Sequence, residues 1–167
     1  IIDTFNAYIH PVVYKKLYHK AKELPDKDLY LASPLDFPAA YRAFYDWCGQ
    51  DTEFAGWGTQ DVPTLAKSAE HYHLPQLTVK QEYDLQAAFS RTLGVNNCIA
   101  LEKAAAYCAI PYTFEFHNAL HDSLYTALVG EFVRPDCLTV PPAEPTPLAE
   151  LAPLCQPKAL PGPFTDK

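Results

Sequence analysis

The spacing of apolar residues along the chain changes between the two-residue period of strands and the 3.6-residue period of helices. β-branched and aromatic residues alternate over residues 1–9 and predict a strand that ends before Pro11. A short apolar run at 54–58 predicts a buried strand, and residues 76–82 predict a third. Because these segments lie between helical patterns, the sequence favours an α/β fold in which helices flank a mixed sheet.

Helices are predicted where apolar residues recur every three or four positions between a capping residue and a glycine or proline. We expect Asp84 to cap one such helix, which ends at Gly94. Another opens at Pro38 and closes at Gly49. The remaining helices are predicted over 63–72, 98–108 and 120–133, with a short one inside the otherwise irregular residues 12–37.

The composition of the chain changes at Arg134. Nine of the sixteen prolines lie between Arg134 and the last residue, in a segment with few aromatic side chains. We therefore predict a domain over residues 1–133 and a proline-rich C-terminal tail over 134–167. A chain of 167 residues is long enough for one domain with its own core.

Composition and charge narrow the function classes. No apolar run approaches the roughly 20 residues that cross a bilayer, so we predict a cytoplasmic protein without membrane association. The five cysteines are scattered and never spaced as C-x-x-C, which favours reduced thiols over disulfides or a zinc site. A net charge of −7 argues against broad electrostatic capture of duplex DNA or RNA. It leaves room for an enzyme that holds a strand end through bound cations.

Three polar residues stand where α/β proteins place functional groups. Asp61 follows a buried strand just before a helix, at the edge of the predicted sheet. His117 precedes the last helix and Asp122 lies in its first turns, so the two can converge at that corner. Neighbouring carboxylates repel unless a cation lies between them, and Mg²⁺ or Mn²⁺ prefers such oxygen ligands. A neutral histidine beside them can take a proton from an attacking water.

Each of these residues also has a simpler interpretation. Asp61 alone could cap the helix that follows, and His117 alone could be a loop or capping histidine. His121 is expected to face solvent. Trp57 is expected in the core, although an aromatic ring beside the site could stack on a base. No substrate-binding residue can be assigned from the sequence.

Two sequence motifs favour a catalytic and metal-binding role for these residues over a purely structural role. The segment His117-Asn-Ala-Leu-His-Asp122, followed by an apolar helix, resembles the third motif of the DEDDh 3′→5′ exonucleases. The segment Phe54-Ala-Gly-Trp-Gly-Thr-Gln-Asp61 resembles the second motif of the Eri-type exoribonuclease branch of that family. Residues 2–11 and 83–89 fit the same branch, and the four segments in order cover about residues 1–133.

The resemblance implies a ribonuclease H-like fold and a specific chemistry. Asp61 and Asp122 would be metal ligands for two Mg²⁺ or Mn²⁺ ions, and His117 would be the general base. The substrate class would be the single-stranded 3′ end of RNA or DNA, trimmed by phosphodiester hydrolysis.

The chain departs from the family at the first motif. That motif, an Asp-x-Glu on an N-terminal strand, would lie upstream of Ile1, so the chain would hold at most half of the metal site. Asp51-Thr-Glu53 has the right residues in the wrong place. A catalytically inactive exonuclease-like module that binds a protein or RNA is therefore the alternative, followed by an unrelated α/β binding domain. The sequence does not predict the oligomeric state.

Overall fold

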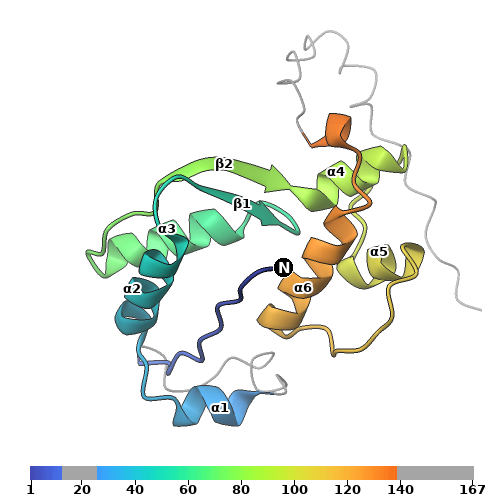
Figure 1. Cartoon of the computed structure of the whole chain (residues 1–167). Helices are drawn as coiled ribbons and strands as arrows, with labels where there is room; N and C mark the ends of the chain where they lie inside the picture. The colour runs from blue at the N-terminus through green and yellow to red at the C-terminus, as the bar shows by residue number, and fades with distance from the viewer. Residues whose placement is uncertain (13–25, 139–167) are drawn as a thin grey trace, which may run out of the picture.

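The computed structural model describes residues 1–12 and 26–138. Within these residues the fold is mixed α/β, with six α-helices, a short 3₁₀ turn and a two-stranded sheet (Figure 1). The elements in chain order are α1 (Lys27–Ala32), α2 (Phe37–Cys48), β1 (Thr52–Gly56), α3 (Asp61–His71), β2 (Val79–Asp84), α4 (Leu85–Thr92), α5 (Leu101–Tyr107), α6 (Ala119–Gly130) and η2 (Pro135–Cys137).

The two strands pair in parallel, and α3 forms the connection between them. Gly56 at the end of β1 lies opposite Asp84 at the end of β2. The carboxyl ends of both strands therefore meet at one edge of the sheet, which is the edge where α/β proteins gather functional groups. The sequence correctly predicted an α/β class, but the described sheet is parallel rather than mixed.

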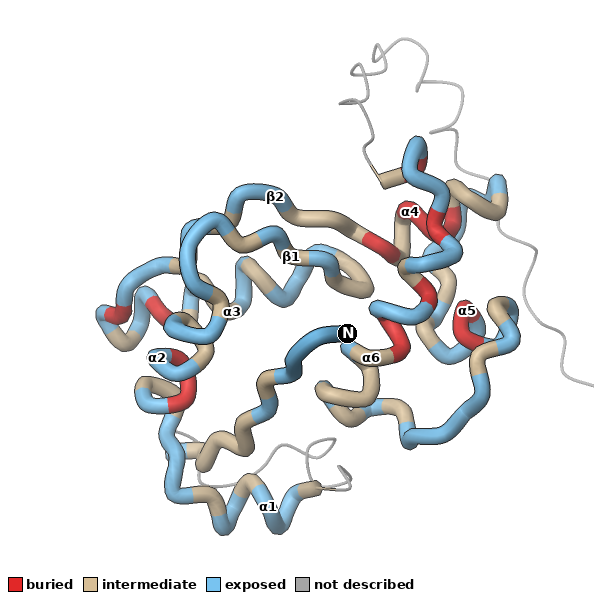
Figure 2. The backbone as a smooth tube through the Cα atoms, in the orientation of Figure 1, coloured by how far each residue is buried: buried red, intermediate tan, exposed pale blue. Residues whose placement is uncertain are grey.

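The buried side chains form two clusters, one at each end of the sheet (Figure 2). The smaller joins α2 and α3 through Tyr41, Ala69 and Leu74. The larger joins α4, α5 and α6, with the following buried residues: Leu85, Ala88, Phe89, Ala104, Ala105, Tyr125, Val129, Val133 and Cys137. Because α6 belongs to the larger cluster, its position relative to the strand ends is set by packing.

The predicted stop of α2 at Gly49 and the predicted cap of α4 at Asp84 are confirmed, whereas α2 begins at Phe37, one residue before the predicted Pro38. Asp36 caps α2 by accepting a hydrogen bond from the backbone N–H of Ala39 at 2.9 Å. The helix ends at Gly49, whose φ of 68° is accessible to glycine without a Cβ penalty. Asp84 caps α4 by accepting from the backbone N–H of Ala87 at 2.9 Å.

Removal of the Asp84 cap tests how much this capping hydrogen bond contributes to the stability of the fold. Asp84→Ala leaves the N–H of Ala87 without its side-chain acceptor, so we expect the free energy of unfolding to fall by about 1 kcal/mol. Urea denaturation measures the change. The matched control is Asp46→Ala, an exposed aspartate in the last turn of α2, which we expect to shift stability by less than about 0.5 kcal/mol. Equal effects of the two substitutions would contradict the capping role.

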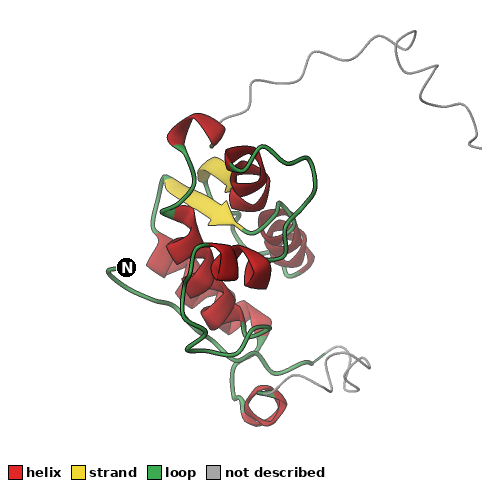
Figure 3. Ribbon diagram, turned by 90° about the vertical axis from the view of Figure 1, so that its right-hand side faces the viewer, coloured by secondary structure: helices red, strands yellow, loops and turns green. Residues whose placement is uncertain are grey.

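The strand predicted over residues 1–9 is wrong. Residues 1–12 form an extended segment outside the sheet, and its side chains pack on helices instead. The ring of Phe5 meets that of Phe44 in α2 at 5.4 Å, and the ring of Tyr8 meets that of Tyr30 in α1 at 5.3 Å. Alternating apolar residues favour an extended backbone, but a strand also requires a partner backbone for its hydrogen bonds. Figure 3 shows α1 set apart from the other helices, at the far end of this segment.

Several predicted boundaries shift by a few residues. Both strands are offset from their predicted ranges, and α3 begins at Asp61 rather than at Pro63. The helix predicted to reach residue 133 ends at Gly130, and a turn follows in which Val133 is buried. Packing also continues beyond the predicted start of the tail, since the Arg91 side chain donates two hydrogen bonds to the carbonyl oxygen of the buried Cys137. Predictions for residues 139–167 lie outside the described residues.

Two expectations from composition concern the described helices and cysteines. No helix in residues 1–12 and 26–138 combines the length and apolar character needed to cross a membrane. The four cysteines within these ranges are free thiols, as predicted. Burial raises the pKa of the Cys48 and Cys108 thiols, which favours their neutral form.

Candidate functional site

The first component of the site is the corner between β1 and α3. Asp61 is the first residue of α3, and Gln60 occupies the capping position before it. The Asp61 side chain therefore lies in the first turn of the helix, at the carboxyl end of the sheet, with its carboxylate exposed. A Cβ atom placed on Gly56 would come within 3.1 Å of the Gly58 carbonyl oxygen and within 3.4 Å of the Asp61 Oδ2 atom. Glycine at the end of β1 thus fits the close approach of the Gly58 carbonyl, with the Asp61 carboxylate beside it.

The second component is the loop that leads into α6. His117 has a φ of 70°, a left-handed conformation uncommon for residues other than glycine. Its backbone N–H donates a hydrogen bond to Oδ1 of Asp122 at 3.2 Å. The sequence prediction that His117 and Asp122 converge at this corner is therefore met, through the backbone of His117 and the side chain of Asp122.

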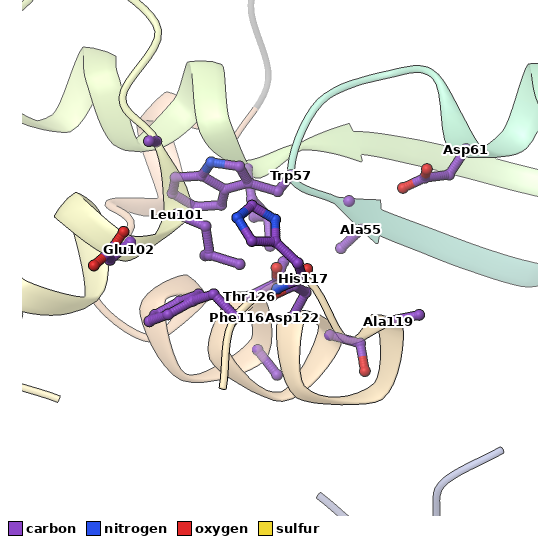
Figure 4. Close-up of a pocket in the computed structure, with 15 residues that line it drawn as sticks. Ala55, Trp57, Asp61, Leu101, Glu102, Phe116, His117, Ala119, Asp122 and Thr126 are labelled. Atoms are coloured by element: carbon purple, nitrogen blue, oxygen red, sulfur yellow. Dashed lines mark hydrogen bonds between the residues drawn. The ribbon is translucent and has the colours of Figure 1, made fainter. Parts of the chain in front are cut away.

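These residues line one hollow of about 660 Å³ (Figure 4). The close-up places His117 and Asp122 together near its centre, with Asp61 at one margin and Trp57 at the back. A volume of this size is typical of sites for small ligands or single building blocks of a polymer. The lining residues come from β1, the β1–α3 corner, the start of α4, α5, and α6 with the loop before it, so the hollow exists only in the folded chain.

The polar groups that line the hollow are mainly acidic. Asp61, Glu102 and Asp122 supply three carboxylates, His117 is the one basic side chain among the lining residues, and lysine and arginine are missing from the lining. An acidic hollow repels a phosphate-bearing ligand unless a cation neutralises part of the charge.

The chemical type of the oxygen atoms at the hollow suits a hard divalent cation. Asp61 and Asp122 present carboxylate oxygens, and only Oδ1 of Asp122 is engaged by the His117 N–H. Across the part of the chain that the structure describes, no three His, Cys, Asp or Glu side chains lie close enough together to hold a metal ion. These two carboxylates would therefore hold an ion only together with further ligands, such as water or the phosphate oxygens of a substrate.

No family model, no curated protein and no solved structure matches this chain.

The structure adds Glu102 to the site, which the sequence did not assign to it, and places Trp57 both against the core and beside the site. Trp57 donates from its indole N–H to the carbonyl oxygen of Ile99 at 3.0 Å, and the Gln86 amide donates to the same oxygen at 2.9 Å. These two hydrogen bonds anchor the segment before α5 next to the end of β1 and the start of α4. The anchoring brings Glu102 into the wall of the hollow. Trp57 is partly buried against the larger core cluster, as predicted, and also faces the hollow. No local pattern in the sequence marks Glu102, because its place depends on this long-range contact.

His121 differs from its prediction. It was expected to face solvent, but its side chain is partly buried and its ring stacks on Phe114 at a centroid distance of 4.8 Å. Its Nδ1 atom also lies 3.1 Å from the carbonyl oxygen of Glu115. His121 therefore holds the loop before His117 against the first turn of α6.

The same loop is anchored by Tyr125. Its hydroxyl donates to the carbonyl oxygen of Phe114 and accepts from the Phe114 N–H, both at 3.0 Å, and its ring stacks on Phe116. Tyr125→Phe removes both hydrogen bonds and keeps the ring, so we expect the free energy of unfolding to fall by about 1 kcal/mol. Urea denaturation tests this against Tyr107→Phe, whose side chain is largely exposed. If both variants were as stable as the wild type, the hydroxyl would not anchor the loop.

Proposed function

We propose that the protein is a 3′→5′ exonuclease with a ribonuclease H-like fold, acting on single-stranded RNA or DNA ends in the cytoplasm. The observation that supports the proposal is the gathering of Asp61, His117 and Asp122 around one hollow from two separate corners of the fold. These are the residues that the motif resemblance assigns to metal binding and to the general base. Their shared position is expected if the resemblance is functional, and it is not required by any of the three residues alone.

The proposed reaction is the hydrolysis of the last phosphodiester bond. The oxygen of a water molecule attacks the phosphorus atom, and the bond from phosphorus to the 3′ oxygen of the preceding nucleotide breaks. The imidazole of His117 takes the proton of the attacking water. The products are a nucleoside 5′-monophosphate and a strand shortened by one nucleotide with a free 3′ hydroxyl.

The chain's own residues have distinct parts in this scheme. The N–H of His117 is bonded to Asp122, which orients the peptide that carries the imidazole toward the hollow. Asp61 and Asp122 would hold Mg²⁺ or Mn²⁺, which supplies the positive charge that a phosphate needs in an acidic hollow. Trp57 and Phe116 offer aromatic surface on which the terminal base could stack.

A direct assay tests the proposal. The full chain is incubated with Mn²⁺ and a 5′-labelled single-stranded oligonucleotide, with RNA and DNA in separate reactions. We expect a ladder that shortens one nucleotide at a time from the 3′ end, and no shortening when a chelator removes the metal. Random internal cuts, or equal cutting in chelator, would contradict the proposal.

A second candidate is a catalytically inactive module that binds an RNA end or a protein. The observation that favours it is that three carboxylates and one histidine line the hollow, but no three of these side chains lie close enough together to hold a metal ion among the described residues. The same assay separates the candidates. Oligonucleotide binding without shortening, measured by fluorescence anisotropy at several Mn²⁺ concentrations, would support the module and exclude the enzyme.

A further inference from the structure

Asn118 lies between His117 and helix α6, and both the oxygen and the nitrogen of its side-chain amide form hydrogen bonds. Its Oδ1 atom caps α6 by accepting from the backbone N–H groups of Leu120 at 3.1 Å and His121 at 3.2 Å. Its Nδ2 atom donates to Oδ2 of Asp26 at 2.5 Å, across 92 residues of sequence. The cap alone would leave the amide nitrogen free, so the contact with Asp26 is a separate, tertiary interaction.

Asp26 directs its carboxylate away from its own helix. It is the N-cap residue of α1, yet its side chain makes no capping hydrogen bond there. The carboxylate instead accepts from Asn118 and, at 3.4 Å, from the hydroxyl of Tyr8 in the N-terminal segment. Aspartate at an N-cap normally bonds its own first turn. The departure indicates that this carboxylate serves the contact with Asn118.

The hydrogen bond between Asn118 and Asp26 lies next to a residue with an unusual backbone conformation. Asn118 follows His117, whose left-handed φ of 70° costs free energy unless surrounding contacts hold it. Asn118 is held at both ends of its side chain, and the His117 N–H is held by Asp122. The peptide between the two held residues therefore has little freedom to leave the left-handed conformation.

We propose that Asp26 is a positioning residue for His117, acting through its hydrogen bond to Asn118. The hydroxyl of Tyr8, in the N-terminal segment, donates to the same carboxylate. The Asp26 carboxylate therefore connects the N-terminal segment, the start of α1 and the start of α6. The chemical role of His117 in this inference rests on the proposed function. The positioning of the His117 loop does not.

Exchange of the two partners provides the sharpest test. Asn118→Asp keeps the oxygen that caps α6 but sets two carboxylates against each other, so the contact is lost. Adding Asp26→Asn restores a donor and an acceptor in reversed order, with the same net charge as the wild type. Asp28→Asn is the matched control, because Asp28 is an exposed carboxylate in the first turn of the same helix.

Hydrogen exchange of the His117 amide, followed by NMR on the full chain, reads out the loop without any need for activity. We expect about tenfold faster exchange in Asn118→Asp and a return to within about twofold of the wild type in the double variant. Asp28→Asn should leave the rate unchanged. A double variant that exchanges as fast as Asn118→Asp would overturn the proposal. If Asn118→Asp fails to fold, Asp26→Ala, which leaves the cap of α6 intact, should still accelerate exchange, and an unchanged rate there would also overturn it.

Kinetics add a readout that general destabilisation would not produce. In a protein that degrades oligonucleotides, Asn118→Asp should lower kcat at least tenfold with KM changed by less than about twofold, and the double variant should recover kcat. A loss that the double variant does not recover would contradict positioning by this pair. A wild type without nuclease activity would refute the proposed function alone, since the exchange rates decide the role of Asp26 separately.

Discussion

His117→Asn is expected to lower kcat for strand shortening by about 100- to 10,000-fold, the range for loss of a general base. Asparagine is a suitable replacement because it adopts the left-handed conformation that His117 has, while lacking a group that can take the proton. The fold should therefore survive, and the free energy of unfolding should change by less than about 1 kcal/mol. Single-turnover rates in Mn²⁺, with urea denaturation of the same samples, measure both quantities.

Asp122 allows its charge and its hydrogen bond to be separated. Asp122→Asn keeps an oxygen that can accept from the His117 N–H but removes the negative charge, whereas Asp122→Ala removes both. If the carboxylate binds a metal ion, both variants should lose about 100-fold or more in kcat. If Asp122 serves only to hold the loop, Asp122→Asn should remain close to the wild type. Site variants that all shorten the strand as fast as the wild type would show that the assignment is wrong.

Phe89→Ala is expected to lower the free energy of unfolding by about 3 to 5 kcal/mol, the usual cost of removing a buried phenylalanine ring. Phe89 is 1% exposed at the centre of the larger core cluster. Its ring meets that of Trp57 at 5.9 Å and that of Tyr107 at 6.0 Å, so it lies beneath the wall of the hollow. A loss of this size is a large fraction of the stability of a domain and should unfold much of the protein at 37 °C.

The matched control for that experiment is Phe132→Ala. Phe132 is 53% exposed, close to the same cluster, and the substitution removes the same ring. We expect a change below about 1 kcal/mol, because about half of this residue is already exposed to solvent. Comparable losses in the two variants would mean that the larger cluster does not have Phe89 at its centre.

Local signals predicted those parts of the fold that depend on neighbouring residues. The cap at Asp84 and the stop at Gly49 belong to helices whose ends depend on contacts within four residues. The strand at residues 1–9 failed for the opposite reason. Its alternating pattern is present, but strand formation depends on a second backbone that no local pattern specifies.

The candidate site divides in the same way. The convergence of His117 and Asp122 could be predicted, because the two residues are only five positions apart at the start of a helix and therefore lie close together. The contact of Trp57 with Ile99 that places Glu102 in the wall, and the hydrogen bond from Asn118 to Asp26, could not be predicted, because each joins segments that are more than 40 residues apart. Such contacts depend on how whole helices pack.

By itself, the sequence determined the α/β class and most of the helices, since periodicity and capping act over one or two turns. It also nominated the three residues that carry the functional hypothesis, through their place at the ends of predicted elements and through the motif resemblance. Only the tertiary structure decided that Asp61 shares a hollow with His117 and Asp122 and that the hollow is acidic. It also decided that the N-terminal segment packs on helices rather than in the sheet. The physical reason is that burial and strand pairing are settled between segments distant in sequence, where side-chain packing and backbone hydrogen bonds compete for the same residues.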